Sequence, residues 1–416
     1  MTPFVRAVAA ILCAAGPVLA GNWPAWRGPD GQGHSPEKDL PLKWSPTDNV
    51  RWKVALPEPG SSTPIVWGDR IFLTQSLDKG THRAVRCYAR ADGKLLWERV
   101  TPFAGKEPTH ATNPYCSASP VTDGERVIAS LGSAGLVCYD LQGKEQWRKD
   151  LGPLIHIWGN ASSPVFYQDL AILWCGPGAR QFLLAVNKTN GQTVWEHAEP
   201  GGKGGPERPY IGSWTTPLVE RVGDHDELVL GVNEKLKAFD PRTGQELWSC
   251  AGLKNANQDE LVYTSPVYAD GIVVALAGFN GAGMAVRAGG HGDVTQTHRL
   301  WYHPRNRQRI GSPVIVGDYV YVLDDSGTAQ CLELKTGKEV WKQDRLGGAW
   351  GSLVATGDRL YVTTNEGTTL VLRAAPKYEL LARNPLAETV RASIVPSDGE
   401  LFIRSHQHLW CISGKK

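Results

Sequence analysis

Five side chains between the predicted strands have the chemistry of a binding site. Trp158, Trp214 and Trp350 offer flat aromatic faces on which a ring can stack. Arg309 and Arg391 can clamp an anion through paired N–H donors. Each also has a structural explanation, because a tryptophan at the start of a strand commonly packs on the neighbouring sheet. The sequence predicts a ligand or cofactor site at these five residues and assigns no catalytic residue.

Oxygen ligands for a hard cation lie nearby, but the sequence predicts no metal site. Asp324-Asp325 and Asn365-Glu366 carry oxygens of the kind that calcium prefers. Both pairs also belong to ordinary turn sequences, Asp-Asp-Ser-Gly and Asn-Glu-Gly. The chain contains no nucleophile elbow, phosphate-binding loop or HExxH motif. Whether the protein is an enzyme stays open at this stage.

The charge balance gives no sign of a nucleic-acid or membrane partner. Lys and Arg number 44 against 42 Asp and Glu, so nothing in the net charge favours nucleic acid or an anionic membrane. Beyond the first twenty residues, no stretch is long and apolar enough for a membrane-spanning helix.

A repeated motif indicates what positions the five side chains. Gly-x-x-x-Trp recurs with constant spacing, each time in a tight turn followed by a strand. The copies are Gly93/Trp97, Gly143/Trp147, Gly191/Trp195, Gly244/Trp248 and Gly337/Trp341. The segment Ser312–Trp341 alone reads as four short strands, which cannot bury both faces without neighbours.

Two further patterns give the number of units. A strand opener, Ser or Thr followed by Pro and an apolar residue, recurs at Pro64, Pro120, Pro164, Pro217, Pro266 and Pro313. Leu353 and Ile394 replace the proline in two degenerate copies. The turn after this strand occurs eight times, at residues 68–69, 123–124, 168–169, 223–224, 270–271, 317–318, 357–358 and 398–399. Units of 40–56 residues with four strands each predict an all-β protein, an eight-bladed β-propeller of four-stranded antiparallel blades.

The chain ends suggest how the propeller closes. The last unit supplies three strands, whereas Arg51–Leu56 carries an additional strand with Trp52, ahead of the first opener. We expect this N-terminal strand to complete the eighth blade and remove the open sheet edge. The alternative is seven blades with a frayed C-terminus.

The interblade segments should meet at one axial face. Each long connector enters the innermost strand of the next blade, and the turns between second and third strands share that face. A Gly-rich insert, residues 278–298, is expected to replace such a turn and to lie as a loop over or beside the opening. Because loops on a rigid scaffold carry function, this face is the predicted binding site.

Three regions divide the chain. Residues 1–20 read as a signal peptide, with Arg6, an apolar core and cleavage after Ala20. Cys13 follows Ile11-Leu12, which lacks the small residue that lipid attachment requires. Residues 21–50 form an N-terminal strap, expected to dock Trp23, Trp26 and Trp44 on the outside of the closing blade. The alternative for the strap is a partner-binding tail, and residues 51–416 form the propeller domain.

The cysteines do not read as a disulfide framework. Cys87, Cys138, Cys331 and Cys411 share one position in the third strand of different blades, where a small buried residue is needed. Cys116 and Cys175 fall on one face of neighbouring blades, so either a bridge or two isolated thiols is compatible with the pattern. The absence of Cys-x-x-Cys argues against zinc-ribbon and haem c sites.

These units resemble the pyrroloquinoline quinone (PQQ) enzyme repeat. The resemblance rests on LKTGKEVW, DPRTGQELW and ARADGKLLW and covers essentially the whole mature chain, with an opening WPAWRGPDGQG similar to that of secreted bacterial PQQ-binding-like propellers. One branch of the family, the quinoprotein alcohol dehydrogenases, holds PQQ and calcium on the axis of eight blades. Another, the outer-membrane assembly lipoprotein, works through protein contacts. This sequence lacks the adjacent cysteines of the first and the lipidated cysteine of the second.

The resemblance and the residues together imply two functions. The first is an exported, periplasmic or secreted, binding or scaffold module that takes a protein, peptide or carbohydrate ligand on its axial face. The alternative is a PQQ- and calcium-dependent oxidoreductase, with the quinone stacked on an axial tryptophan and its carboxylates held by Arg309 or Arg391. The fold alone does not decide between them.

Overall fold

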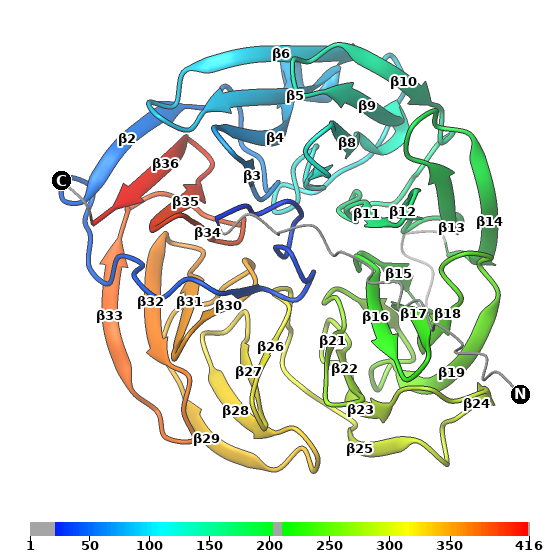
Figure 1. The fold of residues 1–416 in the computed structure, drawn as a ribbon. Coiled ribbons are helices and arrows are strands. Elements are labelled where there is room, and N and C mark those ends of the chain that lie inside the picture. Colours follow the sequence, from blue (N-terminus) through cyan, green and yellow to red (C-terminus); the bar gives the residue numbers. More distant parts are fainter. Residues whose placement is uncertain (1–20, 203–209, 415–416) are drawn as a thin grey trace, which may run out of the picture.

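The computed structural model describes residues 21–202 and 210–414, and these form a ring of eight four-stranded antiparallel blades around a central axis (Figure 1). The predicted fold class is confirmed. The predicted signal peptide, residues 1–20, lies outside the described residues. Among the described residues, no helix has the length and apolar character needed to cross a membrane.

The first four blades run from the innermost strand outward in chain order. Blade 1 comprises β3 (Ile65–Trp67), β4 (Arg70–Leu77), β5 (His82–Ala89) and β6 (Leu95–Pro102); blade 2 comprises β7 (Val121–Thr122), β8 (Arg126–Ser130), β9 (Leu136–Asp140) and β10 (Glu145–Lys149). Blade 3 comprises β11 (Val165–Tyr167), β12 (Leu170–Cys175), β13 (Arg180–Asn187) and β14 (Thr193–Pro200); blade 4 comprises β16 (Leu218–Val222), β17 (His225–Val232), β18 (Glu234–Phe239) and β19 (Glu246–Leu253).

The remaining blades follow the same order. Blade 5 comprises β21 (Val267–Ala269), β22 (Ile272–Leu276), β23 (Gly283–Arg287) and β25 (Arg299–His303); blade 6 comprises β26 (Val314–Val316), β27 (Tyr319–Leu323), β28 (Ala329–Glu333) and β29 (Glu339–Gln343). Blade 7 comprises β30 (Val354–Thr356), β31 (Arg359–Thr363), β32 (Thr368–Arg373) and β33 (Leu380–Pro385); blade 8 comprises β34 (Val395–Ser397), β35 (Glu400–Arg404), β36 (His408–Ser413) and β2 (Val50–Ala55). Two short 3₁₀ turns occur at Asp78–Gly80 and Gly132–Ala134.

The N-terminal strand closes the ring as predicted. β2 pairs antiparallel with β36, with Trp52 opposite Cys411 (Figure 1). The first and last strands of the propeller therefore share one blade, which leaves no gap between the chain ends.

A tryptophan in the outermost strand links six of the eight blades to the next one. The indole N–H of Trp97 donates to the carbonyl of Leu141 in blade 2 at 3.0 Å, and the same kind of bond links five other pairs of neighbouring blades. The glycine of each Gly-x-x-x-Trp motif packs against the tryptophan ring of the preceding blade. A Cβ on Gly143, for example, would lie 2.7 Å from the Trp97 ring. This contact explains why glycine is required at that position, where φ is +83°.

The buried cysteines lie opposite these tryptophans in the sheet ladder. Cys87 pairs with Trp97, Cys138 with Trp147, and Cys331 with Trp341. A small side chain leaves room there for the indole. All seven cysteines among the described residues are buried and free, including Cys116 and Cys175, so the structure forms no bridge between that pair.

A closed ring of hydrogen bonds joins the innermost strands. The backbone N–H of each Ser or Thr at a strand opener donates at 2.8–3.0 Å to the hydroxyl of the equivalent residue in the next blade. The order is Thr63, Ser119, Ser163, Thr216, Ser265, Ser312, Ser352, Ser393 and back to Thr63. The two openers without proline keep this serine, so the hydroxyl is the feature common to all eight.

The expected position of the Gly-rich insert is right for residues 278–282, which form the turn before β23 and place Phe279 at the cavity, and wrong for the rest. Residues Gly283–Arg287 form the third strand of blade 5, and the insert proper lies between that strand and β25. Its short strand β24 (Gly292–Asp293) pairs parallel with β19, so it covers the outer edge of blade 4 rather than the axial opening. Trp248 donates within its own blade to the buried Glu227 carboxylate at 2.9 Å, and the same carboxylate accepts from the Gly289 N–H of the insert at 3.1 Å.

The strap is also placed only in part as expected. Trp23 exchanges two 2.8 Å backbone hydrogen bonds with Val66 of blade 1, and β1 (His34–Ser35) pairs parallel with β30 of blade 7. Between them the chain crosses the centre of the ring, as the dark blue segment in Figure 1 shows, and its bonds to Val66 and Thr122 place it at the far ends of the innermost strands from the connectors. Parts of the strap do contact the closing blade as expected: the Ser397 hydroxyl donates to the Gly21 carbonyl, and Trp23 and Trp44 pack in one core cluster with blade 8 residues.

Candidate functional site

A cavity of about 590 Å³ lies on the axis, inside the ring of strand-opening residues. Its wall combines aromatic side chains with hydroxyl, amide and imidazole groups. Its lining residues include Trp26, Trp158, Tyr210, Trp214, Tyr263, Phe279, Trp350, Asp259, Arg391, His110 and Asn113. Its size falls in the range of sites for small ligands.

One side of the cavity is an aromatic wall from the connectors of blades 3, 4 and 5. Ring centroids of Trp158 and Trp214 are 6.0 Å apart, Tyr210 lies 5.3 Å from Trp158, and Tyr263 meets Trp214 edge-on at 5.2 Å. Tilted and edge-on contacts of this kind are favourable between aromatic quadrupoles. The four rings therefore hold one another in place.

The backbone of two connectors fixes this wall. β15 (Ile211–Ser213) and β20 (Glu260–Val262) pair in parallel, which places Trp214 and Tyr263 next to each other at the ends of the two strands. The Trp214 indole N–H donates to the Gly159 carbonyl at 2.8 Å, and Asn113 Nδ2 donates to the Trp158 carbonyl at 2.7 Å. These hydrogen bonds hold both tryptophans through the indole N–H or the backbone, and do not involve the ring faces on which a ligand could stack.

His156 packs behind the wall as a neutral ring. Its centroid lies 5.0 Å from Trp214 and 5.3 Å from Trp158, and the side chain is 1% exposed. Burial lowers the pKa of His156 to about 4, since the charged imidazolium would lose its hydration. Its role at neutral pH is to support the two indoles.

A second wall comes from blades 6 to 8. The Arg391 guanidinium stacks over the Trp350 ring at 4.1 Å, and the Trp350 indole N–H donates to Asp325. Burial lowers the pKa of Arg391, and the charges of Asp325 and Glu366 offset part of that shift. This wall carries a cation that is already stacked on an aromatic ring.

Arg309 does not line the cavity. Its side chain is 2% exposed, and Nη2 donates to Gln330 Oε1 at 2.6 Å. Burial lowers the pKa of Arg309 to about 10, against the charge of Asp324. Four of the five predicted site residues thus surround one cavity, and the fifth lies outside it.

Charged groups are scarce among the described lining residues. Asp259 supplies their one carboxylate and Arg391 their one guanidinium. Asp259 accepts hydrogen bonds from the Tyr210 N–H at 2.9 Å and from Asn255 Nδ2 at 3.0 Å. The carboxylate therefore organises two connectors.

The sequence did not identify the floor of the cavity. Trp26 comes from the strap and lines the cavity from the end opposite the connectors. Tyr210 lies in the connector that leads into blade 4, and no repeat or motif in the sequence distinguished it or Tyr263. The strap has no strand periodicity, so only its density of Gly, Pro and Trp hinted at a defined conformation.

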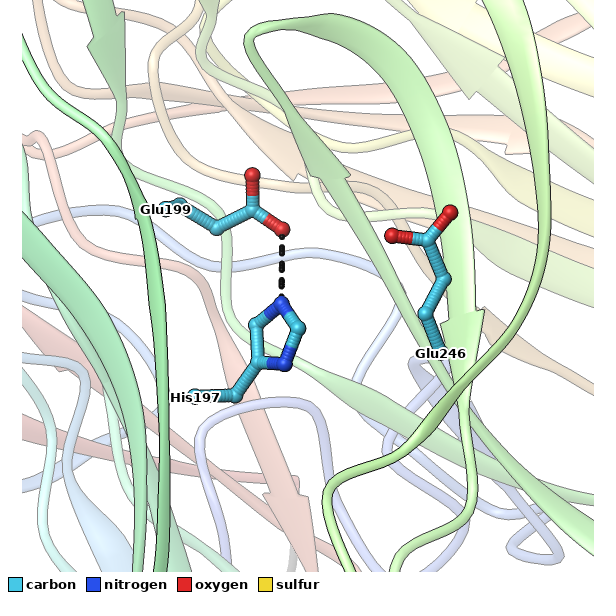
Figure 2. Close-up of side chains that lie close together, drawn as sticks. All are labelled: His197, Glu199 and Glu246. Atoms are coloured by element: carbon cyan, nitrogen blue, oxygen red, sulfur yellow. Dashed lines mark hydrogen bonds and ion pairs between the residues drawn. The ribbon is translucent and has the colours of Figure 1, made fainter.

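One cluster with metal-binding residue types lies away from the axis. His197 and Glu199 of β14 approach Glu246 of β19, with potential ligand atoms within 4.8 Å of one another (Figure 2). Lys237 Nζ bonds both Glu199 oxygens, at 2.7 and 3.0 Å, and Glu246 at 3.1 Å. Burial lowers the pKa of Lys237, but the hydrogen bonds and charge of Glu199 outweigh it, so the net shift is upward. The ammonium thus compensates the two carboxylates.

Known proteins share both the repeat and the fold. A family model described as outer membrane protein assembly factor BamB matches residues 81–343. The BamB of Kangiella koreensis is 32% identical over 126 residues, which cover 27% of this chain and 28% of that protein.

Solved structures agree on the architecture. BamB from Moraxella catarrhalis superposes with a TM-score of 0.62 at 14% identity, covering 87% of this chain and 96% of that one. The quinohemoprotein alcohol dehydrogenase from Comamonas testosteroni gives a TM-score of 0.67 at 12% identity, with 95% and 81% coverage. At such identities the likeness concerns the fold. The family match over residues 81–343 goes further: the chain belongs to the PQQ-repeat β-propeller family represented by the BamB model.

Proposed function

We propose that the protein is an exported binding module that takes a carbohydrate in its axial cavity. The observation that carries the proposal is the aromatic wall of Trp158, Trp214, Tyr210 and Tyr263 beside a polar rim. A sugar ring has an apolar face that stacks on indole and a hydroxyl edge that needs donors and acceptors.

The rim offers such partners. His110 and Asn113 line it, and so do four hydroxyl residues of the blade ring, Thr63, Ser163, Thr216 and Ser393. A hydroxyl whose oxygen accepts a backbone N–H still has its own hydrogen to donate. The scarcity of charged lining groups favours a neutral ligand, because a buried unpaired charge is costly.

PQQ with calcium does not fit the described residues. The quinone's carboxylates require cationic partners, and calcium takes six to eight oxygens. Arg391 is the one guanidinium among the described lining residues, Asp259 is the one carboxylate, and Arg309 lies elsewhere. Among the described residues, the one group of three His, Cys, Asp or Glu side chains with ligand atoms within 4.8 Å of one another lies on β14 and β19. We derive no redox step from this cavity.

Export is part of the proposal. The leader pattern in residues 1–20 and the similarity to proteins named for outer-membrane assembly both support a periplasmic location.

Protein binding is the second candidate, at a different surface. β6 is the outer edge strand of blade 1, and it exposes Leu95, Leu96 and Val100 by 42 to 44%. An edge strand with exposed apolar side chains can pair with a strand of another protein. The relatives named as assembly factors lend this candidate its support.

The test is a binding screen of the mature chain. Titration calorimetry with neutral glucan, xylan, mannan, galactan and chitin oligosaccharides should find a saturable ligand, and Trp214→Ala should weaken it about tenfold through lost stacking. Tyr302→Ala, which removes an aromatic ring from β25, should leave the affinity unchanged. If no oligosaccharide binds, the carbohydrate proposal is wrong. A saturable rise of melting temperature with PQQ and calcium would overturn the misfit argued above.

A further inference from the structure

The strap crosses the propeller axis, and this decides the shape of the cavity. The carbonyl of Pro24 accepts a 2.9 Å hydrogen bond from the Thr122 N–H in blade 2. Arg27, three residues later, donates through Nη2 to the Pro313 carbonyl in blade 6 at 2.7 Å. Blades 2 and 6 are opposite in a ring of eight, so Trp26 lies between two diametrically placed anchors.

Both ends of the crossing segment are tied down. On one side Trp23 is 1% exposed and bonded to Val66 in blade 1. On the other, Gln32 Oε1 accepts from the Tyr268 N–H in blade 5 at 2.5 Å, and the Gly33 carbonyl accepts from Ala355 in blade 7 at 2.8 Å. Contacts to so many blades make the segment part of the scaffold.

Local geometry turns the chain at this crossing. Gly28 has φ +79°, and a Cβ there would lie 2.8 Å from the Trp23 ring. Arg27 is 2% exposed and directs its guanidinium into the carbonyls of blade 6. Trp23 and Arg27 bond to blades 1 and 6, whereas the Trp26 side chain lines the cavity.

Among the described residues, the strap therefore closes the cavity at the end opposite the connectors. A ligand enters from the connector face and stops at the Trp26 ring. About 590 Å³ accommodates roughly one or two sugar rings. A polymer cannot thread through the axis, because the strap and its anchors stand in the way.

We infer that the site recognises the end of a glycan chain and that Trp26 is the floor residue that sets how far the end can enter. This inference rests on the proposed carbohydrate function. It adds a specificity that the aromatic wall alone would not impose, since an open channel with the same wall would also bind chain interiors.

The wild-type protein tests the inference with two matched sets of ligands. The first set is the linear neutral oligosaccharides of the screen, from one to six units. The second is cyclic oligosaccharides of the same sugars, which have no ends. Affinity should stop rising after about two units, and the cyclic members should not bind. Affinity that keeps rising to six units, or binding of cyclic members, overturns end recognition and leaves carbohydrate binding intact.

Variants at the floor test the role of Trp26. Trp26→Ala should weaken the shortest ligand about tenfold, and Trp26→Phe should restore most of the affinity because a ring still covers the floor. Unchanged affinity in Trp26→Ala would show that Trp26 does not contact the ligand. If the Ala variant unfolds, Trp26→Leu takes its place, because it keeps an apolar side chain but no ring, and it should weaken the shortest ligand by a similar factor. Failure of every oligosaccharide to bind wild type overturns the carbohydrate function, and the inference with it.

Discussion

The backbone N–H of Ser393 donates a 3.0 Å hydrogen bond to the hydroxyl of Thr63, although 330 residues separate them in the chain. This bond completes the ring of Ser and Thr openers around the axis. At the same blade boundary, Trp52 of β2 donates to the Arg90 carbonyl at 2.9 Å. The propeller is thus closed near its axis by a hydroxyl and near its rim by an indole.

Thr63→Val should weaken this closure while keeping the shape of the side chain. The buried Ser393 N–H would lose its acceptor, which costs about 1–3 kcal/mol of unfolding free energy. Urea denaturation followed by circular dichroism gives the value. Thr189→Val, at an exposed turn position, is the control and should change stability by less than about 0.5 kcal/mol. Equal effects in the two variants would mean that the ring of hydroxyls contributes little.

Comparing Gly143→Ala with Gly317→Ala separates two contributions to the loss of unfolding free energy: a steric clash with a neighbouring ring and the strain of a positive φ. Both glycines have positive φ, +83° and +57°, so each alanine pays about 1–2 kcal/mol for the left-handed conformation. Only at Gly143 would the new Cβ also press on Trp97, whereas nothing lies within 4 Å at Gly317. We expect a clearly larger loss of unfolding free energy for Gly143→Ala in the same urea titrations. A loss no larger than that of Gly317→Ala would contradict the interblade contact at Gly143.

His156 should make stability depend on pH. Its pKa in the folded protein is lowered to about 4 by burial, below the ordinary value of 6.5, so protonation favours the unfolded chain. The unfolding free energy should therefore be fully retained above about pH 6.5 and fall by up to about 3 kcal/mol as the pH decreases toward 4. His156→Gln should flatten this slope in urea titrations at several pH values, whereas His291→Gln, at an exposed position, should not. An unchanged slope in His156→Gln would indicate that other groups set the acid sensitivity.

The two arginines named from the sequence should behave differently. Arg391→Met should weaken ligand binding, because its guanidinium lines the cavity over Trp350. Arg309→Met should leave binding unchanged, because its side chain lies outside the cavity, and should lower the unfolding free energy, because Gln330 Oε1 would lose its donor. Calorimetric titration and urea denaturation of both variants check this pair. Weaker binding in Arg309→Met would contradict the placement of Arg309 outside the cavity.

Local patterns were sufficient to predict the propeller. Hairpin turns such as Thr336-Gly337 and the spacing from Gly337 to Trp341 depend on neighbouring residues, and their repetition implies blades that need one another. The surplus strand with Trp52 and the deficit at the C-terminus predicted the closure for the same reason. Most of the insert of blade 5 was misplaced because Gly283–Arg287 is rich in small residues and lacks the β-branched run that identifies a strand.

The sequence by itself determined the number of blades, their closure and the face on which the connectors gather. Only the tertiary structure decided which side chains reach the axis. Arg309 and Arg391 hold similar places near strand entries, yet one is buried against Gln330 and the other lines the cavity. The direction of a side chain reverses with one residue of register, and the strap has no period from which a register can be derived. Trp26 reaches the axis because anchors in blades 2 and 6 fix the strap between them, and those contacts exist only once the ring has closed.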